Sequence, residues 1–174
     1  MNRTICTVMA TRIEECERAI DELAAAGASP RAIVQLRRDF GESAARQLLE
    51  VAALQPKARR KFGPGTWWVT NRSLQQATPW QVAARKADWL AGCPVLDLCC
   101  GIGGDAMQFA SRSRLTAIDV DPLVIAYAKA NLRKVGSLQS PQFVCQDVTE
   151  IALPRDCAIH IDPDRRARLG FPHR

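Results

Sequence analysis

One stretch decides the fold of this chain: Val95-Leu96-Asp97-Leu98-Cys99-Cys100-Gly101-Ile102-Gly103-Gly104-Asp105. A short apolar segment that carries one acid, Asp97, runs into a glycine-rich turn, and helix-forming residues follow at once. Glycine adopts backbone angles that other residues disfavour, and a glycine-rich turn before a helix lets a ligand approach the main chain. The stretch therefore predicts a strand, a ligand-binding turn and a helix.

The same alternation continues along the rest of the chain. Strands are predicted over residues 94–99, 114–119, 142–146 and 157–162, and helices over 105–111 and 122–134. Strands that alternate with helices form parallel sheets through right-handed crossovers. Residues 93–174 are therefore predicted to form an α/β, Rossmann-like domain with a partial parallel sheet of about four strands.

Residues 1–56 have the pattern of a small helical bundle that precedes this domain. A capping box at residues 11–14 predicts the start of one helix, which ends at Gly27. A second helix starts at Ser29, and a third ends before Pro56. The apolar residues recur at helical spacing, so we predict core packing here and no chemistry.

Residues 57–92 are predicted to be a linker and a lead-in helix. The linker begins with a basic run: Lys57, Arg59, Arg60 and Lys61. Trp67 and Trp68 follow, in a predicted short strand at 67–70. Basic residues beside aromatic ones bind RNA through phosphate contacts and base stacking, but the same tryptophans equally fit a core with solvated basic neighbours. The lead-in helix starts at Thr78 and ends at Gly92.

Composition and charge narrow the class of protein. The net charge is +6, and residues 1–91 hold most of the excess, with 14 Lys and Arg against 9 Asp and Glu. Such a surface fits an RNA partner, or is simply solvated. The seven cysteines lack metal-site spacing, and the sequence has no long apolar run and no secretory signal. We therefore expect a cytoplasmic protein with reduced thiols, no metal and no membrane contact.

Each predicted strand ends at or near an acid: Asp97, Asp119, Asp147 and Asp162. Because the carboxyl ends of parallel strands meet at one edge of a sheet, these acids are expected to line one site. Asp97 suits an ammonium group, Asp119 the two hydroxyls of a ribose and Asp147 an adenine amino group. S-adenosylmethionine carries all three groups. The predicted cofactor-binding residues are Asp97, Cys99, Gly101, Gly103, Asp119, Val120 and Asp147.

A nicotinamide cofactor is the competing interpretation of the glycine turn. Residues 101–106 also fit the pattern G-x-G-x-x-G/A, and Asp119 follows at a suitable distance for a dinucleotide ribose. However, Asp97 and Asp105 place negative charge where a pyrophosphate would lie, and this charge attracts a cationic ligand. We therefore favour S-adenosylmethionine, and a nicotinamide-dependent oxidoreductase stays the weaker alternative.

Three segments resemble the motifs of class I S-adenosylmethionine-dependent methyltransferases. Residues 96–105 are similar to the first motif, residues 117–122 with Asn131 downstream to the second, and residues 145–147 to the third. Residues 161–166 lie where amino-group methyltransferases carry an Asp/Asn-Pro-Pro-aromatic motif. The resemblance spans about residues 57–166, and it implies a class I methyltransferase fold with S-adenosylmethionine as cofactor.

A narrower resemblance is to a bacterial subfamily with a THUMP-like RNA-binding domain. It rests on Gln76-Ala77-Thr78 and on the Asp-Pro-x-Arg-Arg pattern at 162–166, and trimethylguanosine synthases are more distantly similar. The resemblance implies methyl transfer to a nitrogen of RNA. The chemistry of the residues predicts that Asp162 and Pro163 accept hydrogen bonds from the target amine. Arg165 and Arg166 either bind a substrate phosphate or form a solvated basic turn, and the basic run of residues 57–61 supplies further phosphate-binding candidates.

The chain departs from these families in two ways. No aromatic residue follows Pro163, and the last three strands of the family have no counterpart before Arg174. We therefore expect a further segment, or a second copy in a homo-oligomer, to cover the edge of the fourth strand. The alternative function is a cofactor-binding RNA-interaction module or fragment without activity of its own.

Overall fold

The structure is a computed structural model and describes residues 3–163. Within that range five helices come first: α1 Arg3–Ala26, α2 Pro30–Phe40, α3 Glu42–Phe62, α4 Asn71–Gln76 and α5 Trp80–Trp89. Strands and helices then alternate: β1 Val95–Leu98, α6 Ala106–Ala110, β2 Leu115–Asp119, α7 Pro122–Leu132, β3 Gln142–Cys145, the 3-10 helix η1 Val148–Glu150 and β4 Ala158–Ile161. None of the helices in this part of the chain is long and apolar enough to cross a membrane.

The four strands of the described residues form one parallel sheet in the order β3-β2-β1-β4. The chain adds β2 and β3 on one side of β1 and then returns to place β4 on the other side. Asp97 of β1 thus lies beside Ala117 of β2 and His160 of β4. Ligands of open parallel sheets bind where the strand order reverses, which here is between β1 and β4. The predicted Rossmann-like α/β fold is confirmed.

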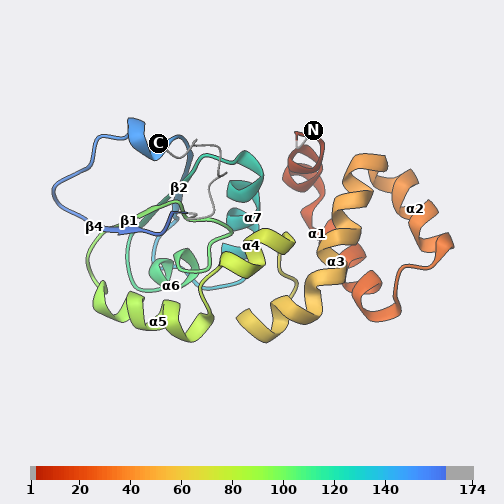
Figure 1. Cartoon of the computed structure of the whole chain (residues 1–174), viewed down its shortest axis with the longest axis horizontal. Coiled ribbons are helices and arrows are strands. Elements are labelled where there is room, and N and C mark those ends of the chain that lie inside the picture. The colour runs from red at the N-terminus through yellow and green to blue at the C-terminus, as the bar shows by residue number, and fades with distance from the viewer. Residues whose placement is uncertain (1–2, 164–174) are drawn as a thin grey trace, which may run out of the picture.

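Helices α5, α6 and α7 form a layer over one face of this sheet, and α1 to α3 lie at the far end of the molecule (Figure 1). Side chains alternate along a strand, so Asp97 and its neighbour Ala117 face the helix layer. The opposite face carries a smaller apolar cluster of Leu96, Leu98 and Ile118, which residues 148–157 partly cover.

The β4 edge presents apolar side chains within the described residues. Ile159 and Ile161 lie on the face opposite the helix layer and are 43% and 55% exposed. Such a strand edge invites pairing with another segment. That a further segment or a second copy covers it stays a prediction.

Helix α1 joins two helical segments across a kink at Arg12, whose backbone angles are φ −138° and ψ 34°. The kink lies within residues 11–14, where the sequence predicted a helix to start. Thr11 donates its hydroxyl to the carbonyl of Thr7, one turn before it. The segment before the kink, which begins at Arg3, was not predicted, and its residues Ile5 and Met9 are buried in the core.

Helix α3 also overrides a local signal. The predicted end before Pro56 is wrong, because the helix continues through this proline to Phe62. Proline removes one helical hydrogen bond. Beyond it, Ala58 and Phe62 are buried, so core packing outweighs that loss.

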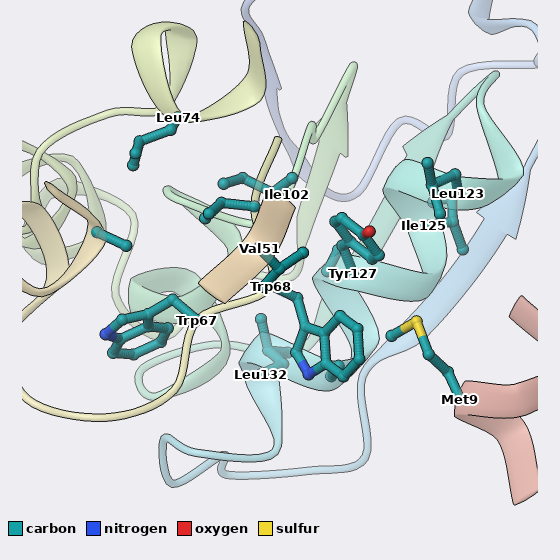
Figure 2. Close-up of a cluster of buried hydrophobic side chains, with 14 of the residues drawn as sticks. Met9, Val51, Trp67, Trp68, Leu74, Ile102, Leu123, Ile125, Tyr127 and Leu132 are labelled. Atoms are coloured by element: carbon teal, nitrogen blue, oxygen red, sulfur yellow. The ribbon is translucent and has the colours of Figure 1, made fainter. Parts of the chain in front are cut away.

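Trp67 and Trp68 belong to the hydrophobic core. Trp68 is fully buried, and its ring centroid lies 5.4 Å from that of Tyr127 on α7 (Figure 2). Residues 67–70 form no strand, so that part of the prediction is wrong. Of the two interpretations of the aromatic pair, core packing holds, because buried rings cannot stack on RNA bases.

One core runs from the N-terminal helices into the layer beside the sheet. It joins residues of three regions: the N-terminal helices, the connector between α3 and α4 (residues 63–70), and the α/β unit. These residues are Ile20, Leu48, Trp68, Leu115 and Tyr127. The predicted units 1–56, 57–92 and 93–174 therefore share one core, and α3 crosses the first boundary.

Candidate functional site

A cavity of about 610 Å³ lies at the carboxyl ends of the strands. Its size is typical of small-molecule sites. The predicted site residues in its wall are Asp97, Cys99, Gly101, Asp119, Val120, Asp147, Asp162 and Pro163. The structure thus brings together the four acids that end the strands, as the parallel topology predicted.

Asp119 holds the glycine turn in place. Its Oδ2 accepts a hydrogen bond from the backbone N–H of Gly101 at 3.0 Å, and its Oδ1 accepts one from Asp121 at 3.0 Å. Asp121 in turn caps α7 by accepting from Leu123, as predicted. The turn itself is tight, because Cys99 and Gly101 both have left-handed φ angles, 59° and 56°. The strand end and the turn therefore form one hydrogen-bonded unit.

The turn spans residues 99–105, all of which the structure describes. Gly103 is the one residue of this turn that does not line the cavity. A Cβ at this position would contact Ala128 of α7 at 3.5 Å, and its φ is 87°. A Cβ on Gly104 would come within 3.1 Å of the backbone nitrogen of Thr78. The two glycines thus let the turn pack between α7 and the segment before α5.

Asp97 is 1% exposed and belongs to a chain of polar contacts. Its Oδ1 lies 2.8 Å from Nδ1 of His160, its neighbour on β4. Nε2 of the same ring lies 3.2 Å from Nζ of Lys86 on α5, which also lies 3.0 Å from Asp105 Oδ2 and 3.4 Å from Thr78 Oγ1. Thr78 donates to the same Asp105 oxygen, so it does not cap α5 as predicted.

Two oxygens of this network have no hydrogen-bond partner in the part of the chain that the structure describes: Asp97 Oδ2 and Asp105 Oδ1. Both residues line the cavity. Burial raises the pKa of Asp97, and the hydrogen bond with Asp97 raises the pKa of His160. Unpaired buried carboxylates are costly, so this end of the cavity suits a cation and disfavours a pyrophosphate.

Asp147 and Asp162 occupy the more open side of the cavity. Asp147 Oδ1 accepts from the backbone N–H and the hydroxyl of Thr149, and the backbone bond lowers the pKa of Asp147. Asp162 is exposed directly after β4, and its N–H donates to the carbonyl of Leu98 at 3.4 Å. Each side chain is therefore accessible as an acceptor.

Two of the basic residues proposed for RNA tie α3 to its neighbours. Arg59 donates to Asp21 on α1, and Lys61 donates to the carbonyl of Leu74 on α4 at 2.6 Å. Burial lowers the pKa of Lys61. Neither residue lines the cavity formed by the described residues. Their contacts give them a structural role.

Two further predicted substrate residues, Lys57 and Arg60, do not line the cavity that the described residues form. Lys57 and Arg60 are exposed on α3, and Arg165 and Arg166 lie outside the described residues. A basic residue that does line the cavity is Arg72 of α4.

Sequence reasoning missed His160, Lys86 and helix α4. His160 stands two residues before Asp162, so strand alternation gives both the same face, and this was an available signal. Helix α4 has a capping signal as well, because Thr70 and Ser73 cap each other's backbone N–H groups. Lys86 lies on a helical face that was assigned to core packing.

Residues 95–161 match the family model described as a methyltransferase domain. The match and the relatives below agree with the predicted enzyme class, an S-adenosylmethionine-dependent methyltransferase, and with the predicted cofactor.

Relatives of the methyltransferase domain extend the comparison. The chain is 32% identical over 140 residues to an uncharacterised S-adenosylmethionine-dependent methyltransferase of Mycobacterium tuberculosis, across 76% of this chain and 38% of that protein. It is 31% identical over 123 residues to the 23S rRNA (uracil(747)-C(5))-methyltransferase RlmC of Salmonella paratyphi B, across 64% and 32%. The matched part of this chain therefore spans less than two fifths of either relative.

A solved structure shares the fold of this chain. It is the crystal structure of a protein from Porphyromonas gingivalis W83 named as a methyltransferase, with a TM-score of 0.56 and 20% identity. The alignment covers 75% of this chain and 34% of that one.

Proposed function

We propose that this chain binds S-adenosylmethionine in the cavity and methylates RNA at a base nitrogen. The observation that carries the proposal is the line of Asp97, Asp119 and Asp147 along one cavity at the reversal point of the sheet. When bound, S-adenosylmethionine supplies an electrophilic methyl group on a sulfonium.

The residues present fit the three polar parts of this cofactor. Asp97 lines the cavity with a buried carboxylate whose Oδ2 has no partner among the described residues, and its charge suits an ammonium group beside it. Each oxygen of Asp119 already accepts one backbone hydrogen bond and retains a lone pair for a ribose hydroxyl. Val120 is 66% exposed and offers an apolar surface to the adenine ring, with Asp147 as acceptor for its amino group.

Asp162 and Pro163 are proposed to receive the target amine. They follow β4 and line the same cavity as the cofactor residues. The carboxylate of Asp162 and the carbonyl of Pro163 can accept hydrogen bonds from an exocyclic amine and orient its lone pair. The resemblance of residues 162–166 to the Asp-Pro-x-Arg-Arg motif of the THUMP-like subfamily supports an amine as target.

Three observations support RNA as the substrate. The relative RlmC is named as an rRNA methyltransferase. The basic excess lies in residues 1–91. Arg72 of α4 lines the cavity, and an arginine side chain is suited to bind a phosphate.

The test has a binding arm and a transfer arm. Calorimetry with S-adenosylhomocysteine and with a nicotinamide dinucleotide measures the cofactor preference. Transfer of a labelled methyl group to bulk bacterial RNA, followed by mass spectrometry of the nucleosides, identifies the target atom. We expect S-adenosylhomocysteine to bind, the dinucleotide not to bind, and N-methylated nucleosides to form.

Each contrary outcome refutes a different part of the proposal. Methyl groups on uracil C5, the atom named for RlmC, would overturn the nitrogen target. Cofactor binding without transfer would favour the RNA-interaction module. Binding of the dinucleotide alone would overturn the cofactor and with it the whole function.

A further inference from the structure

We propose that His160 is a positioning residue that makes cofactor binding at Asp97 pH-dependent, because a proton on its imidazole and the ammonium group of the ligand compete to neutralise the same buried charge. This inference rests on the proposed function, since the ligand is S-adenosylmethionine or its product. His160 itself belongs to none of the methyltransferase-like motifs found in the sequence.

The contacts of His160 fix its tautomer. Lys86 Nζ can only donate, and it lies 3.2 Å from Nε2, so Nε2 accepts and the ring proton sits on Nδ1. Nδ1 then donates to Asp97 Oδ1 at 2.8 Å. Lys86 has an acceptor for each of its three protons in this arrangement: Asp105 Oδ2, Thr78 Oγ1 and His160 Nε2.

With a neutral imidazole the network has one negative charge in excess. It contains the carboxylates of Asp97 and Asp105 and the ammonium group of Lys86. The two oxygens without a partner among the described residues belong to these same carboxylates. The network is therefore one cation short, and the ammonium group of a ligand bound beside Asp97 balances its charge.

Protonation of His160 supplies the missing positive charge too, so it competes with the ammonium group of the ligand. It neutralises the excess charge, but it removes the acceptor of Lys86 and sets two cations 3.2 Å apart. The bond to Asp97 raises the pKa of His160 above its usual value of 6.5 and so favours the protonated ring in the free chain. Binding of the ligand cation then expels the proton.

The surroundings of the ring come from three elements. Asp97 faces it from β1, Lys86 from α5 and Asp105 from the start of α6. The ring of Phe109 on α6 packs edge-on, with centroids 5.1 Å apart, and restricts the orientation of the imidazole. The two carboxylates favour the protonated form of His160, and the ammonium group of Lys86 disfavours it. All three charges are held in place by packed side chains.

The test compares two ligands across pH in calorimetry with the full chain. S-adenosylhomocysteine carries the ammonium group, whereas 5′-methylthioadenosine keeps the adenosine part and lacks the amino acid. Below the pKa of His160, we expect the affinity for S-adenosylhomocysteine to fall by up to about tenfold per pH unit, with proton release on binding. The affinity for 5′-methylthioadenosine should stay constant over the same range.

His160→Asn is the matched variant, because its amide nitrogen can replace Nδ1 as donor to Asp97 but cannot titrate. We expect the variant to bind S-adenosylhomocysteine with the same affinity at about pH 5.5 and about pH 8. Proton release by the wild-type chain, measured in buffers of different ionisation enthalpy, tests the idea without any variant.

The two proposals fail in different ways. If the wild-type chain binds S-adenosylhomocysteine equally well across the pH range, or if His160→Asn keeps the wild-type dependence, the role of His160 is refuted and the proposed function stands. If neither ligand binds at about pH 8, the proposed function is refuted, and this inference with it.

Discussion

Asn131 and Trp68 pair like neighbouring strands, although one partner is a side chain. Asn131 Oδ1 accepts from the N–H of Trp68 at 2.8 Å, and its Nδ2 donates to the Trp68 carbonyl at 2.9 Å. The same Nδ2 donates to the carbonyl of Ile102 in the glycine turn at 3.0 Å. One fully buried amide thus joins the connector, the turn and α7, which gives a physical role to a residue that the sequence showed only as part of a motif.

Asn131→Ala should be strongly destabilising. The substitution leaves a backbone N–H and two carbonyls without partners in the core, so we expect the free energy of unfolding to fall by about 3 kcal/mol in urea denaturation. Asn71→Ala, on the exposed first turn of α4, is the matched control and should change it by less than about 0.5 kcal/mol. Equal losses in the two variants would contradict the role of Asn131.

Asp119→Ala should abolish cofactor binding. It removes the acceptors for the ribose and releases the N–H groups of Gly101 and Asp121, so affinity for S-adenosylhomocysteine should fall at least about 100-fold in calorimetry. Asp156→Ala, an exposed acid away from the cavity wall, should retain the wild-type affinity. Normal binding by a folded Asp119→Ala variant would place the ribose elsewhere.

Gly104→Ala should disturb the packing of the glycine turn against Thr78, which lies just before α5. The new methyl group would lie 3.1 Å from the backbone nitrogen and 3.3 Å from the carbonyl oxygen of Thr78, and backbone atoms yield little. We expect lower thermal stability and weaker binding of S-adenosylhomocysteine. Gly136→Ala is the control, because its Cβ meets no described atom within 4 Å. If both variants behave alike, the close approach at Gly104 is unimportant.

His160 should also link folding stability to pH. The bond with Asp97 raises its pKa in the folded chain above 6.5. A group with a raised folded-state pKa stabilises the fold fully below its unfolded value, and this contribution disappears as pH rises through the folded value. As the pH rises from below 6.5 through the raised pKa, the wild-type chain should therefore lose stability relative to His160→Asn in urea denaturation. A constant difference between the two proteins would contradict the raised pKa.

Arg72→Ala should weaken RNA binding more than loss of a distant charge does. If the guanidinium at the cavity wall pairs with a phosphate, its removal should lower affinity and reduce the salt dependence by about one unit of slope. Arg38→Ala, exposed on α2, removes the same charge far from the cavity. Identical effects of the two substitutions in filter binding would show that Arg72 contributes net charge alone.

Local signals predicted the α/β unit well and the helix ends poorly. Alternating strands and helices gave the parallel sheet, because each signal lies within a few residues. The end of α3 was misplaced, since buried Phe62 extends this helix past a proline, and the part of α1 before its kink at Arg12, with buried Ile5 and Met9, was not predicted. Packing against distant residues outweighs such local preferences.

By itself, the sequence determined which acids would meet at one edge of a parallel sheet, because that follows from strand direction and the glycine turn alone. Only the tertiary structure decided that Asp97 has His160 as its partner, 63 residues away, and that Lys61 holds α4. Strand register and helix docking set those pairs. Both depend on how one continuous core packs, and no local pattern records that packing.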